Sequence, residues 1–299
     1  MNIEKTALIT ICGRPNEGKS TLANAIVGEK IAIVSNKPQT TRNRIYAVHN
    51  TEDTQLVFMD TPGYHRPKSR LDEYMVEVVR ESFSGTDAVV LVVEPIANVG
   101  PQEAQLIEYI KGSRAPSVLV INKIDTVAKE ELLAVIATYS EAFAFAHIMP
   151  ISAKTGEGVK ELLDLLCGFA MEGPPLFPED MVTDQPDRQI CAEMVREKLL
   201  YCLNHEIPHG TAVEVTRFTE REDTEIIDLD VTIYCEKASH KSIIIGKGGS
   251  MLKKIGALAR KDIERYMGTK VYLQTWVKVK ENWRDSDFLV RNFGYRSDD

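Results

Sequence analysis

Short apolar runs alternate with amphipathic segments through the first part of the chain. The apolar runs, each of which ends at a polar or turn cluster, are Ala7–Ile11, Gln55–Met59, Ala88–Val93, Ser117–Ile121 and His147–Ile151. The segments with helical periodicity are Thr21–Val27, Leu71–Ser84, Pro101–Lys111, Lys129–Ala146 and Val159–Phe169. This repetition predicts an α/β fold in which helices cover both faces of a mostly parallel sheet and ligands bind where the strands end.

The pattern changes after Gly173–Asp180, a segment with three prolines that helices and central strands both reject. A chain of 299 residues suits two domains. We predict them at residues 1–172 and 184–299, joined by a linker at 173–183, and expect the second to be α+β. Its predicted helices are Arg188–Leu203 and Ser250–Met267, and its predicted strands are Thr211–Thr219, Glu225–Cys235 and Lys270–Lys280.

Composition excludes several classes of protein. No uninterrupted apolar run is longer than Ala88–Val93, which is far shorter than the ~20 residues that span a bilayer. The segment Met1–Lys5 lacks the charged start and apolar stretch of a signal peptide. The five cysteines form no C-x-x-C pair, which indicates free thiols in a reducing compartment. We therefore expect a cytoplasmic protein without a membrane span.

Charge is distributed unevenly along the second domain. The net charge of the chain is −8, yet residues 237–284 hold twelve Lys and Arg against three acidic side chains. Residues 214–236 hold eight acidic and two basic side chains. A basic segment beside an acidic one indicates a domain with one face suited to phosphates. The simpler alternative is a solvated helix face.

The segment Gly13–Ser20 has the pattern G-x-x-x-x-G-K-[ST] between a predicted strand and a predicted helix. In that context backbone N–H groups and the helix dipole point at phosphate oxygens. Lys19 can reach the terminal phosphates, and the hydroxyl of Ser20 can ligate Mg²⁺. The sequence therefore predicts a site for a nucleoside triphosphate.

Three further motifs each follow a predicted strand. In Asp60–Gly63, the carboxylate can reach Mg²⁺ through a water and the Gly63 N–H can bond a terminal phosphate. In Asn122–Asp125, the carboxylate of Asp125 can accept two hydrogen bonds from guanine, a donor pair that adenine lacks. Ser152–Lys154 completes the base pocket through backbone N–H groups. Four motifs in this order predict a guanine-nucleotide site.

A polar segment without periodicity, Lys37–Arg44, is predicted to be a switch loop that orders when a threonine meets Mg²⁺ and the γ-phosphate. We expect Thr41 to be that ligand, with Thr40 as the alternative. A plain surface loop is the simpler interpretation. Tyr64 stands where signalling GTPases place a water-orienting glutamine, so intrinsic hydrolysis is expected to be slow, on the order of 10⁻⁴ to 10⁻² s⁻¹.

One motif is misleading. His205–His209 matches the zinc-protease pattern H-E-x-x-H, but it contains Pro208 and is followed by Gly210. Proline removes a backbone donor and breaks the helix that would align the two histidines. We therefore do not expect zinc there.

The segment Gly246–Gly249 offers a G-x-x-G loop almost free of side chains, followed by a basic helix. Such a loop lets a nucleic-acid backbone approach main-chain N–H groups, while an adjacent groove takes about four unpaired bases. Local propensity favours a strand for Ser242–Ile245. A nucleic-acid-binding module with a G-x-x-G loop requires a short helix there, so we expect the context of the fold to override local propensity. The predicted RNA-binding residues are Gly246, Lys247, Gly248, Gly249, Lys253, Lys254, Arg260 and Lys261.

Taken together, these motifs resemble the bacterial Era GTPases over nearly the whole chain. The segments Gln39–Arg42, Phe177–Asp180 and Trp276–Lys280 also look like characteristic stretches of that family. The resemblance implies a Ras-like P-loop GTPase domain followed by a type II K homology (KH) domain. It further implies GTP or GDP with Mg²⁺ as ligands, and binding to the 3′ end of small-subunit ribosomal RNA during 30S assembly. Peripheral association with the inner face of the cell membrane is implied as well, and we expect a monomer.

Two positions in the phosphate loop add to this picture. Asn16 matches the asparagine by which related GTPases hold K⁺ against the phosphates, so K⁺ is a further expected cofactor. Glu17 departs from the family, which usually has a small or apolar residue there. A carboxylate beside the phosphates is expected to weaken nucleotide binding unless it points to solvent.

The predicted site residues fall into three overlapping sets. Those expected to bind nucleotide are Asn16, Glu17, Gly18, Lys19, Ser20, Thr21, Asn122, Lys123, Asp125, Ser152, Ala153 and Lys154. Those expected to act in catalysis are Lys19, Thr41, Asp60 and Gly63, and those expected at the metal are Ser20, Thr41 and Asp60. Two functional classes remain open: a GTPase whose hydrolysis times its release from RNA, and an RNA-binding module with GTP as a static ligand.

Overall fold

The structure, a computed structural model, describes residues 3–222 and 224–296. The chain forms two compact units. The first contains the residues up to Ala32 together with Thr41–Pro67 and Asp72–Asp184. The second contains Ile33–Thr40, Lys68–Leu71 and the residues from Gln185 onward. The predicted limits of the two domains and of the linker between them stay a prediction.

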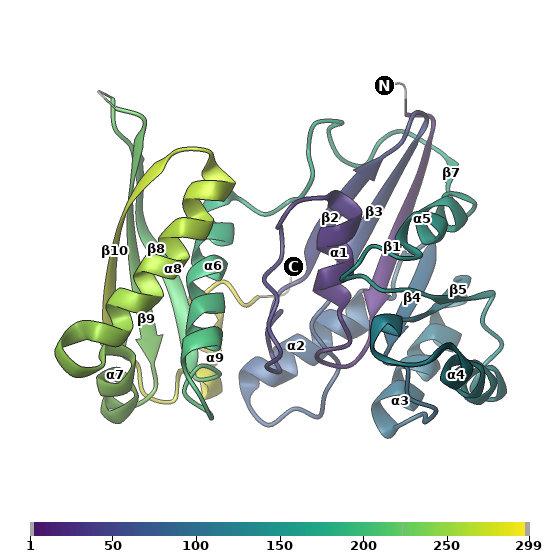
Figure 1. Ribbon diagram of the computed structural model, residues 1–299, viewed down its shortest axis with the longest axis horizontal. Coiled ribbons are helices and arrows are strands. Elements are labelled where there is room, and N and C mark those ends of the chain that lie inside the picture. The colour runs from purple at the N-terminus through teal and green to yellow at the C-terminus, as the bar shows by residue number, and fades with distance from the viewer. Residues whose placement is uncertain (1–2, 223, 297–299) are drawn as a thin grey trace. The chain divides into compact units, whose positions relative to one another are not determined.

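A seven-stranded sheet forms the centre of the first unit (Figure 1). Its strands are β1 (Lys5–Cys12), β2 (Ile45–Asn50), β3 (Thr54–Asp60), β4 (Ala88–Val93), β5 (Ser117–Ile121), β6 (His147–Pro150) and β7 (Met171–Glu172). The order is β2-β3-β1-β4-β5-β6, with β7 also paired to β1. Among the strands of this sheet within the described residues, β2 and β7 alone run antiparallel to their neighbours. The prediction of a mostly parallel sheet is confirmed.

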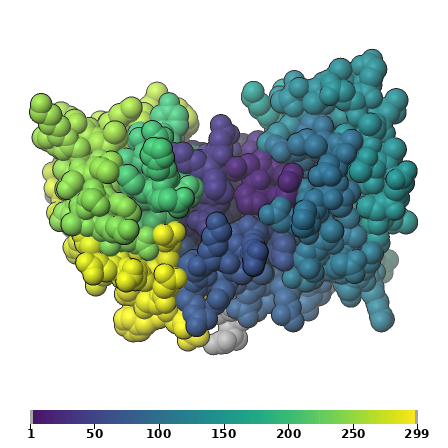
Figure 2. All heavy atoms as spheres, turned by 90° about the horizontal axis from the view of Figure 1, so that it is seen from below, coloured from purple at the N-terminus to yellow at the C-terminus, as the bar shows by residue number. Residues whose placement is uncertain are grey.

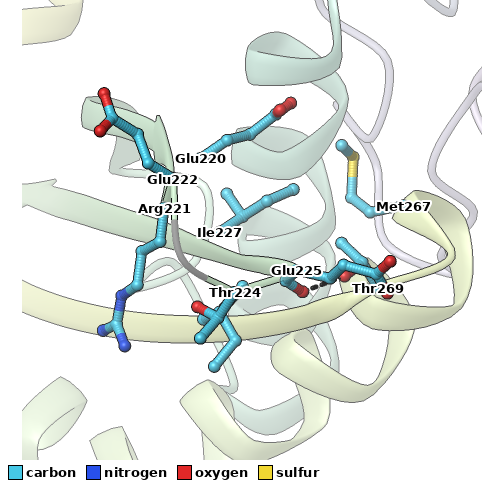
Figure 3. A pocket seen from close by; sticks show the side chains of 9 residues that line it. Glu220, Arg221, Glu222, Thr224, Glu225, Ile227, Met267 and Thr269 are labelled. Atoms are coloured by element: carbon cyan, nitrogen blue, oxygen red, sulfur yellow. Dashed lines mark hydrogen bonds between the residues drawn. The ribbon is translucent and has the colours of Figure 1, made fainter.

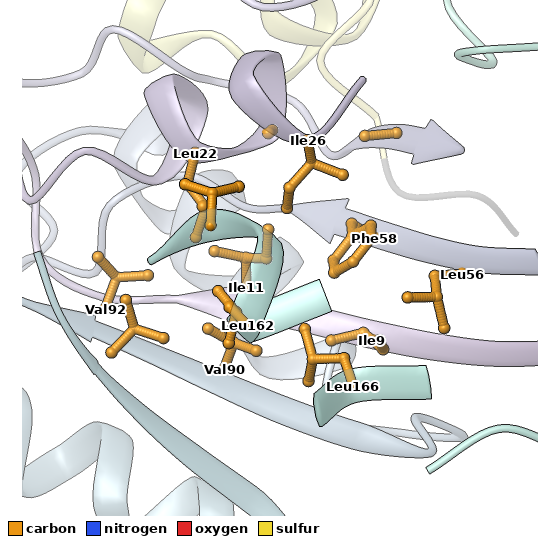
Figure 4. Close-up of a cluster of buried hydrophobic side chains, with 14 of the residues drawn as sticks. Ile9, Ile11, Leu22, Ile26, Leu56, Phe58, Val90, Val92, Leu162 and Leu166 are labelled. Carbon is orange, nitrogen blue, oxygen red and sulfur yellow. The ribbon is translucent and has the colours of Figure 1, made fainter. Parts of the chain in front are cut away.

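Helices cover both faces of this sheet. They are α1 (Lys19–Val27), α2 (Arg70–Glu81), α3 (Pro101–Ser113), α4 (Lys129–Ala142) and α5 (Val159–Cys167). On one face, apolar side chains of α1 and α5 such as Leu22 and Leu162 pack on Ile9, Ile11 and Phe58 of the sheet (Figure 4). On the other face, α2, α3 and α4 contribute to a second buried cluster. Alternating side chains of fully buried strands supply both clusters, as parallel sheets require.

The parallel strands of the first unit all end at one edge of the sheet, and α1 begins there (Figure 1). Figure 2 views the molecule from that side, where atoms of the N-terminal part of the chain lie among those of the later segments of the first unit. Because βα connections cross this edge, the loops after β1, β3, β5 and β6 meet there. These loops carry the four predicted nucleotide motifs.

The proline-rich segment lies against β2 and β3 of the first unit. The backbone N–H groups of Leu176 and Phe177 both donate to the side-chain oxygen of Gln55, at 2.7 and 2.9 Å. Further along, the Val48 N–H donates to the Val182 carbonyl at 2.9 Å. Proline cannot join a sheet ladder fully, so side-chain acceptors such as Gln55 replace part of the missing pairing.

The second unit packs helices on one three-stranded sheet (Figure 1). Its elements are α6 (Asp187–Cys202), β8 (Thr211–Glu220), β9 (Ile226–Cys235), α7 (Ala238–Ile245), α8 (Ser250–Met267), β10 (Lys270–Val279) and α9 (Asp287–Asn292). The order is β10-β9-β8, antiparallel between β8 and β9 and parallel between β9 and β10. Ser242–Ile245 is helical, so context overrides the local strand propensity as expected.

The differences from the sequence-based prediction include an unpredicted strand, β2, and an earlier end of helix α4. Strand β2 was not predicted, because Ile45–Asn50 mixes aromatic, polar and apolar residues and depends on pairing with its hairpin neighbour β3 and on a bridge to Thr183. Helix α4 ends at Ala142 rather than Ala146, since Phe143 is extended and its ring stacks edge to face on Phe145. This aromatic contact competes with helix continuation.

Within residues 3–222 and 224–296, no helix combines the length and the apolar character that crossing a membrane requires. The apolar run Ala88–Val93 forms β4, whose side chains are all buried in the first unit.

Replacing Leu162 by alanine is expected to destabilise the first unit. The Leu162 side chain is fully buried between α5 and the sheet, so its truncation leaves a cavity that costs about 2–5 kcal/mol. Leu133 on α4 is 71% exposed and provides the control, since Leu133→Ala is expected to stay within about 0.5 kcal/mol. Urea unfolding, followed by circular dichroism and by hydrogen exchange in β1 and β4, measures both. Equal losses would contradict this assignment of the core.

Candidate functional site

The phosphate loop lies between the end of β1 and the start of α1. Gly18 has φ +96, and a Cβ there would lie 2.2 Å from Asn122 Nδ2. Both facts explain why only glycine fits. Asn16 also has a positive φ, of 68°. The loop leaves the first backbone N–H groups of α1 without a side-chain cap, which is the arrangement that receives an anion.

Lys19 bends over this loop. Its Nζ donates to the Arg14 carbonyl at 2.7 Å, and its side chain is nearly fully buried. Burial lowers the pKa of Lys19, against the opposing charges of Glu17 and Asp60. A buried ammonium placed at the loop is well suited to pairing with terminal phosphates.

Two hydroxyl groups, of Ser20 and Thr41, and the carboxylate of Asp60 lie together where the metal ion was predicted. The Ser20 hydroxyl donates to Asp60 Oδ2 at 2.6 Å, and its oxygen lies 2.7 Å from Thr41 Oγ1. The second carboxylate oxygen of Asp60 is buried without a hydrogen-bond partner among the described residues. Burial raises the pKa of Asp60 to about 6. A compact set of oxygen ligands with one orphaned acceptor fits Mg²⁺, a hard cation.

The structure separates the two adjacent threonines. Thr41 contacts Ser20 in the first unit, whereas the Thr40 hydroxyl donates to the Lys37 carbonyl at 2.6 Å within its own loop. The geometry therefore supports Thr41 as the switch ligand. Residues 28–44 contain no helix or strand, in agreement with the absence of periodicity.

The base pocket is assembled around Asn122. Its Nδ2 donates to the Glu17 carbonyl at 2.8 Å, and its Oδ1 accepts from the Ala153 N–H at 2.9 Å. The Ser152 hydroxyl donates to Asp125 Oδ1 at 2.8 Å. This bond orients a carboxylate that is otherwise exposed. The loops after β5 and β6 therefore meet as predicted.

Lys123 links the same pocket to the phosphate loop. Its Nζ donates to the Asn16 carbonyl and to Glu94 Oε1, both at 2.6 Å. The structure places Thr21 in the first turn of α1 and Lys154 in an exposed turn after β6. The nucleotide roles of all these residues stay predictions.

The loop after β3 lies directly against the phosphate loop. A Cβ on Gly63 would lie 2.5 Å from the Pro15 nitrogen, and the Tyr64 N–H donates to the Gly13 carbonyl at 3.0 Å. The Tyr64 ring packs edge to face on Tyr109 of α3, at 5.9 Å between centroids. The Tyr64 ring therefore contacts α3, and the expectation that Tyr64 does not orient a water stays a prediction.

Sequence reasoning missed three ion pairs beside these loops. His65 Nδ1 lies 2.8 Å from the Gly63 carbonyl and its Nε2 lies 3.0 Å from Asp72 Oδ1, so the ring braces the loop against α2. Arg14 Nε lies 3.0 Å from Glu17 Oε1 and 2.7 Å from Glu103 Oε1. Asp72 and Glu103 belong to no motif, and only their positions in helical first turns could have drawn attention to them.

In the second unit, the G-x-x-G loop connects α7 to α8. Gly246, Gly248 and Gly249 all have positive φ, and Lys247 and Gly248 are exposed. A Cβ on Gly246 would lie 2.7 Å from the Cβ of Met251. The predicted basic residues Lys253, Lys254, Arg260 and Lys261 are all exposed on α8. The helix buries Ile255, Ala259 and Ile263, so its two faces are clearly separated.

The segment with the H-E-x-x-H pattern forms a turn. His205–Gly210 is not helical, and His205 has φ 56°. Across residues 3–222 and 224–296, no group of three His, Cys, Asp or Glu side chains is arranged to hold a metal ion.

A cavity of about 560 Å³ opens at the far end of α8 from the G-x-x-G loop (Figure 3). Its lining includes Glu220, Glu222, Glu225 and Met267. None of the predicted nucleotide or RNA residues contributes to it.

The chain is similar to known proteins over nearly all of its length. A family model described as a 50S ribosome-binding GTPase matches residues 8–123, and a KH domain model matches residues 206–284. The GTPase Era of Alkaliphilus oremlandii is 51% identical over 291 residues, which are 97% of this chain and 99% of the relative.

Two solved structures have the same fold. A crystal structure of Era in complex with MgGDPNP and nucleotides 1506–1542 of 16S ribosomal RNA has a TM-score of 0.94 and 36% identity. It matches 98% of this chain and 99% of its own. A single-residue variant of Aquifex aeolicus Era bound to GDP·AlF4⁻ has a TM-score of 0.93 and 36% identity, over 97% of this chain and 99% of its own. The prediction of a Ras-like GTPase domain followed by a KH domain is confirmed.

Asp125→Asn is expected to change the base preference from GTP to XTP. The carboxylate accepts from guanine N1–H and N2–H₂, whereas an amide can donate to the xanthine oxygen that replaces the amino group. The Ser152 bond to Asp125 Oδ1 can persist to the amide oxygen. Competition of GTP and XTP against a fluorescent nucleotide measures the preference. A variant that retains the wild-type preference for GTP would place the base elsewhere.

Proposed function

We propose that this chain, which belongs to the Era family of GTPases, couples GTP hydrolysis to binding of the 3′ end of small-subunit ribosomal RNA during 30S assembly. One observation carries the proposal. A single chain joins four guanine-nucleotide motifs at adjacent strand ends to an exposed G-x-x-G loop with a basic helix. The solved Era complex, which contains both MgGDPNP and 16S ribosomal RNA, supports the same pairing of ligands.

Nucleotide binding is assigned to the strand-end loops. Backbone N–H groups of Gly18 to Thr21 receive the phosphates, and Lys19 pairs with the terminal ones. Ser20, Thr41 and Asp60 would hold Mg²⁺, which supplies positive charge to the phosphate oxygens. Asp125 selects guanine, while Asn122, Ser152 and Ala153 keep its loop in place.

We attribute hydrolysis to groups that stabilise the negative charge on the γ-phosphate in the transition state. We assign the Gly63 N–H as a hydrogen-bond donor to that phosphate. The His65 ring contacts the Gly63 carbonyl through one nitrogen and Asp72 through the other. Because the Tyr64 ring packs on Tyr109, we infer that Tyr64 does not take the role of the water-orienting glutamine of signalling GTPases. We infer slow intrinsic hydrolysis, with K⁺ held at Asn16 as the additional positive charge.

RNA binding is assigned to the second unit. Gly246–Gly249 lets the RNA backbone approach main-chain N–H groups, and the exposed lysines and arginine of α8 meet phosphates. We place this activity in the cytoplasm, in a monomer, with peripheral association at the inner face of the membrane as a further proposal.

Single-turnover hydrolysis of GTP, with and without 30S subunits, tests the function as a whole. We expect a slow basal rate that the subunit raises. A basal rate indistinguishable from that of free GTP, unchanged by the subunit, would leave GTP as a static ligand and contradict the coupling.

Hydrolysis is expected to be faster in KCl than in NaCl at equal ionic strength. The physical reason is that K⁺ at Asn16 would offset negative charge on the phosphates in the transition state. Asn16→Ala is expected to abolish the difference while nucleotide binding persists. Phosphate release measured in both salts is the test, and equal wild-type rates would remove K⁺ from the mechanism.

Replacing Lys247 and Gly248 by aspartates is expected to weaken RNA binding about a hundredfold, roughly 3 kcal/mol. Both residues are exposed and no atom lies within 4 Å of a Cβ built on Gly248, so the fold should persist. Aspartate also tolerates the positive φ of Gly248. The new charges repel phosphates and the side chains block close approach of the RNA backbone.

Lys111 and Gly112 on α3 offer a matched control, since they form an exposed Lys-Gly pair in the first unit. Their double aspartate variant changes the net charge equally and should keep wild-type RNA affinity. Titration of a short RNA with the small-subunit 3′ sequence compares the three proteins. Equal affinity in all three, with GTP binding intact, would show that the G-x-x-G loop is only a turn.

A further inference from the structure

The segment Ile33–Thr40 belongs to the second unit, although the residues directly before and after it belong to the first. Its end falls at the peptide bond between Thr40 and Thr41. Within the first unit, Thr41 Oγ1 lies 2.7 Å from the Ser20 hydroxyl oxygen. The residue that we assign to Mg²⁺ and the γ-phosphate is therefore joined by one covalent bond to a backbone segment whose surroundings lie in the second unit.

One side chain of α6, that of Arg196, binds the last two residues of this segment. Its Nη1 donates to the Gln39 carbonyl at 3.3 Å, and its Nη2 donates to the Thr40 carbonyl. The Glu193 carboxylate accepts from Nε at 2.8 Å and also from Nη2. Arg196 is 0% exposed. A guanidinium that a carboxylate fixes on one side presents its other N–H groups in a rigid geometry, so the two carbonyls are held in place.

The backbone that Arg196 holds has an uncommon conformation. Gln39 has φ 59°, in the left-handed region that residues with a side chain seldom adopt. Such a conformation persists only where the surrounding structure enforces it, and it is frequent in switch regions and ligand clamps. The hydrogen bonds from Arg196 to the carbonyls of Gln39 and of the next residue help to enforce it.

Two further contacts hold the same segment on α6. Near its start, the Val34 N–H donates to Glu197 Oε1 at 3.1 Å. In its middle, Lys37 Nζ donates to the carbonyl of Leu203, the residue that follows α6. Helix α6 in turn packs on α8, the basic helix, through buried apolar side chains of both. The segment before Thr41 is thus fixed at several points to the helix that supports the predicted RNA-binding helix.

Packing alone does not explain a charged side chain at the position of Arg196. Burying an ion pair adds little stability compared with an apolar side chain of similar volume. An apolar side chain could fill the same space on α6, but it could not donate to two carbonyls. What the guanidinium adds is the fixed backbone of Gln39 and Thr40.

We propose that Arg196 is a positioning residue for GTP: it fixes the backbone of Gln39 and Thr40 so that Thr41 is presented to Mg²⁺ and the γ-phosphate. The second unit thereby takes part in distinguishing GTP from GDP, which has no γ-phosphate. The proposal rests on the proposed function, because it requires Thr41 as the switch ligand. Its physical basis is that a loop ordered in advance loses less entropy when the ligand binds.

Arg196→Gln is expected to weaken binding of GDPNP about five- to tenfold while GDP binding changes less than about twofold. In the variant the loop must be ordered at the expense of binding energy, and only a ligand with a γ-phosphate uses Thr41. Glu193 is partly exposed, so its carboxylate can reach solvent when the guanidinium is removed. Titration of fluorescent GDPNP and GDP in the presence of Mg²⁺ measures both affinities.

Arg188→Gln is the matched control, because Arg188 is exposed on the same helix. It should leave both affinities at their wild-type values. Lys37→Met releases the same segment from Leu203 at a partly exposed position, and it should weaken GDPNP binding selectively, about two- to threefold. Melting temperatures show whether each variant is folded. If Arg196→Gln does not fold, Lys37→Met decides, and equal changes for GDPNP and GDP would overturn the proposal.

A double-mutant cycle with Thr41→Ala tests whether Arg196 acts through Thr41. We expect Thr41→Ala to weaken GDPNP binding, and Arg196→Gln to add little in that background. Additive losses, or equal losses for GDPNP and GDP in Arg196→Gln alone, would show a merely structural role and overturn the proposal while the proposed function stands. An unchanged GDPNP affinity in Thr41→Ala would instead contradict Thr41 as the switch ligand in the proposed function, and the proposal would fall with it.

Discussion

One buried amide, that of Asn122, joins the parts of the predicted nucleotide site. It donates to the carbonyl of Glu17 in the phosphate loop and accepts from the N–H of Ala153 in the loop after β6. Its side chain also occupies the space that a Cβ on Gly18 would need. Because β1, β5 and β6 all end at the same edge of a parallel sheet, one short side chain can span the three loops. The register of the sheet is thus the condition for the site.

The same sheet edge concentrates charge in a buried setting. Lys19, Asp60, Glu17 and Glu103 are all nearly inaccessible to solvent before any ligand is counted. Buried charges are tolerated only where partners compensate them. Here the compensation is incomplete, since Asp60 and Glu103 each retain a buried oxygen without a partner among the described residues. An incompletely compensated site can gain from binding a cation.

Much of this arrangement was predictable from the sequence because each element has a strong local signal. Strands β4 and β5 and helix α8 have the predicted limits, since long apolar or periodic runs bounded by polar residues leave little choice. The four motifs lie at strand ends as predicted because each follows such a strand, and the roles of their residues stay predictions. Strand β2 and the end of α4 lack that signal, and their limits depend on a hairpin partner and on an aromatic contact.

What the sequence did not predict lies where the backbone or the burial departs from local preference. Asn16 and Lys123 both have positive φ, which is uncommon for residues with a side chain, and Lys123 donates to the Asn16 carbonyl. Glu17 is buried although glutamate is almost never buried without a partner, and its partner Arg14 is shared with a residue far along the chain. Local rules could not indicate these features, because distant residues stabilise them. Proteins depart from local rules at functional sites, and all three of these residues lie in the phosphate loop or contact it directly, whereas other described non-glycine residues with positive φ, such as Arg114 and Asn282, lie elsewhere.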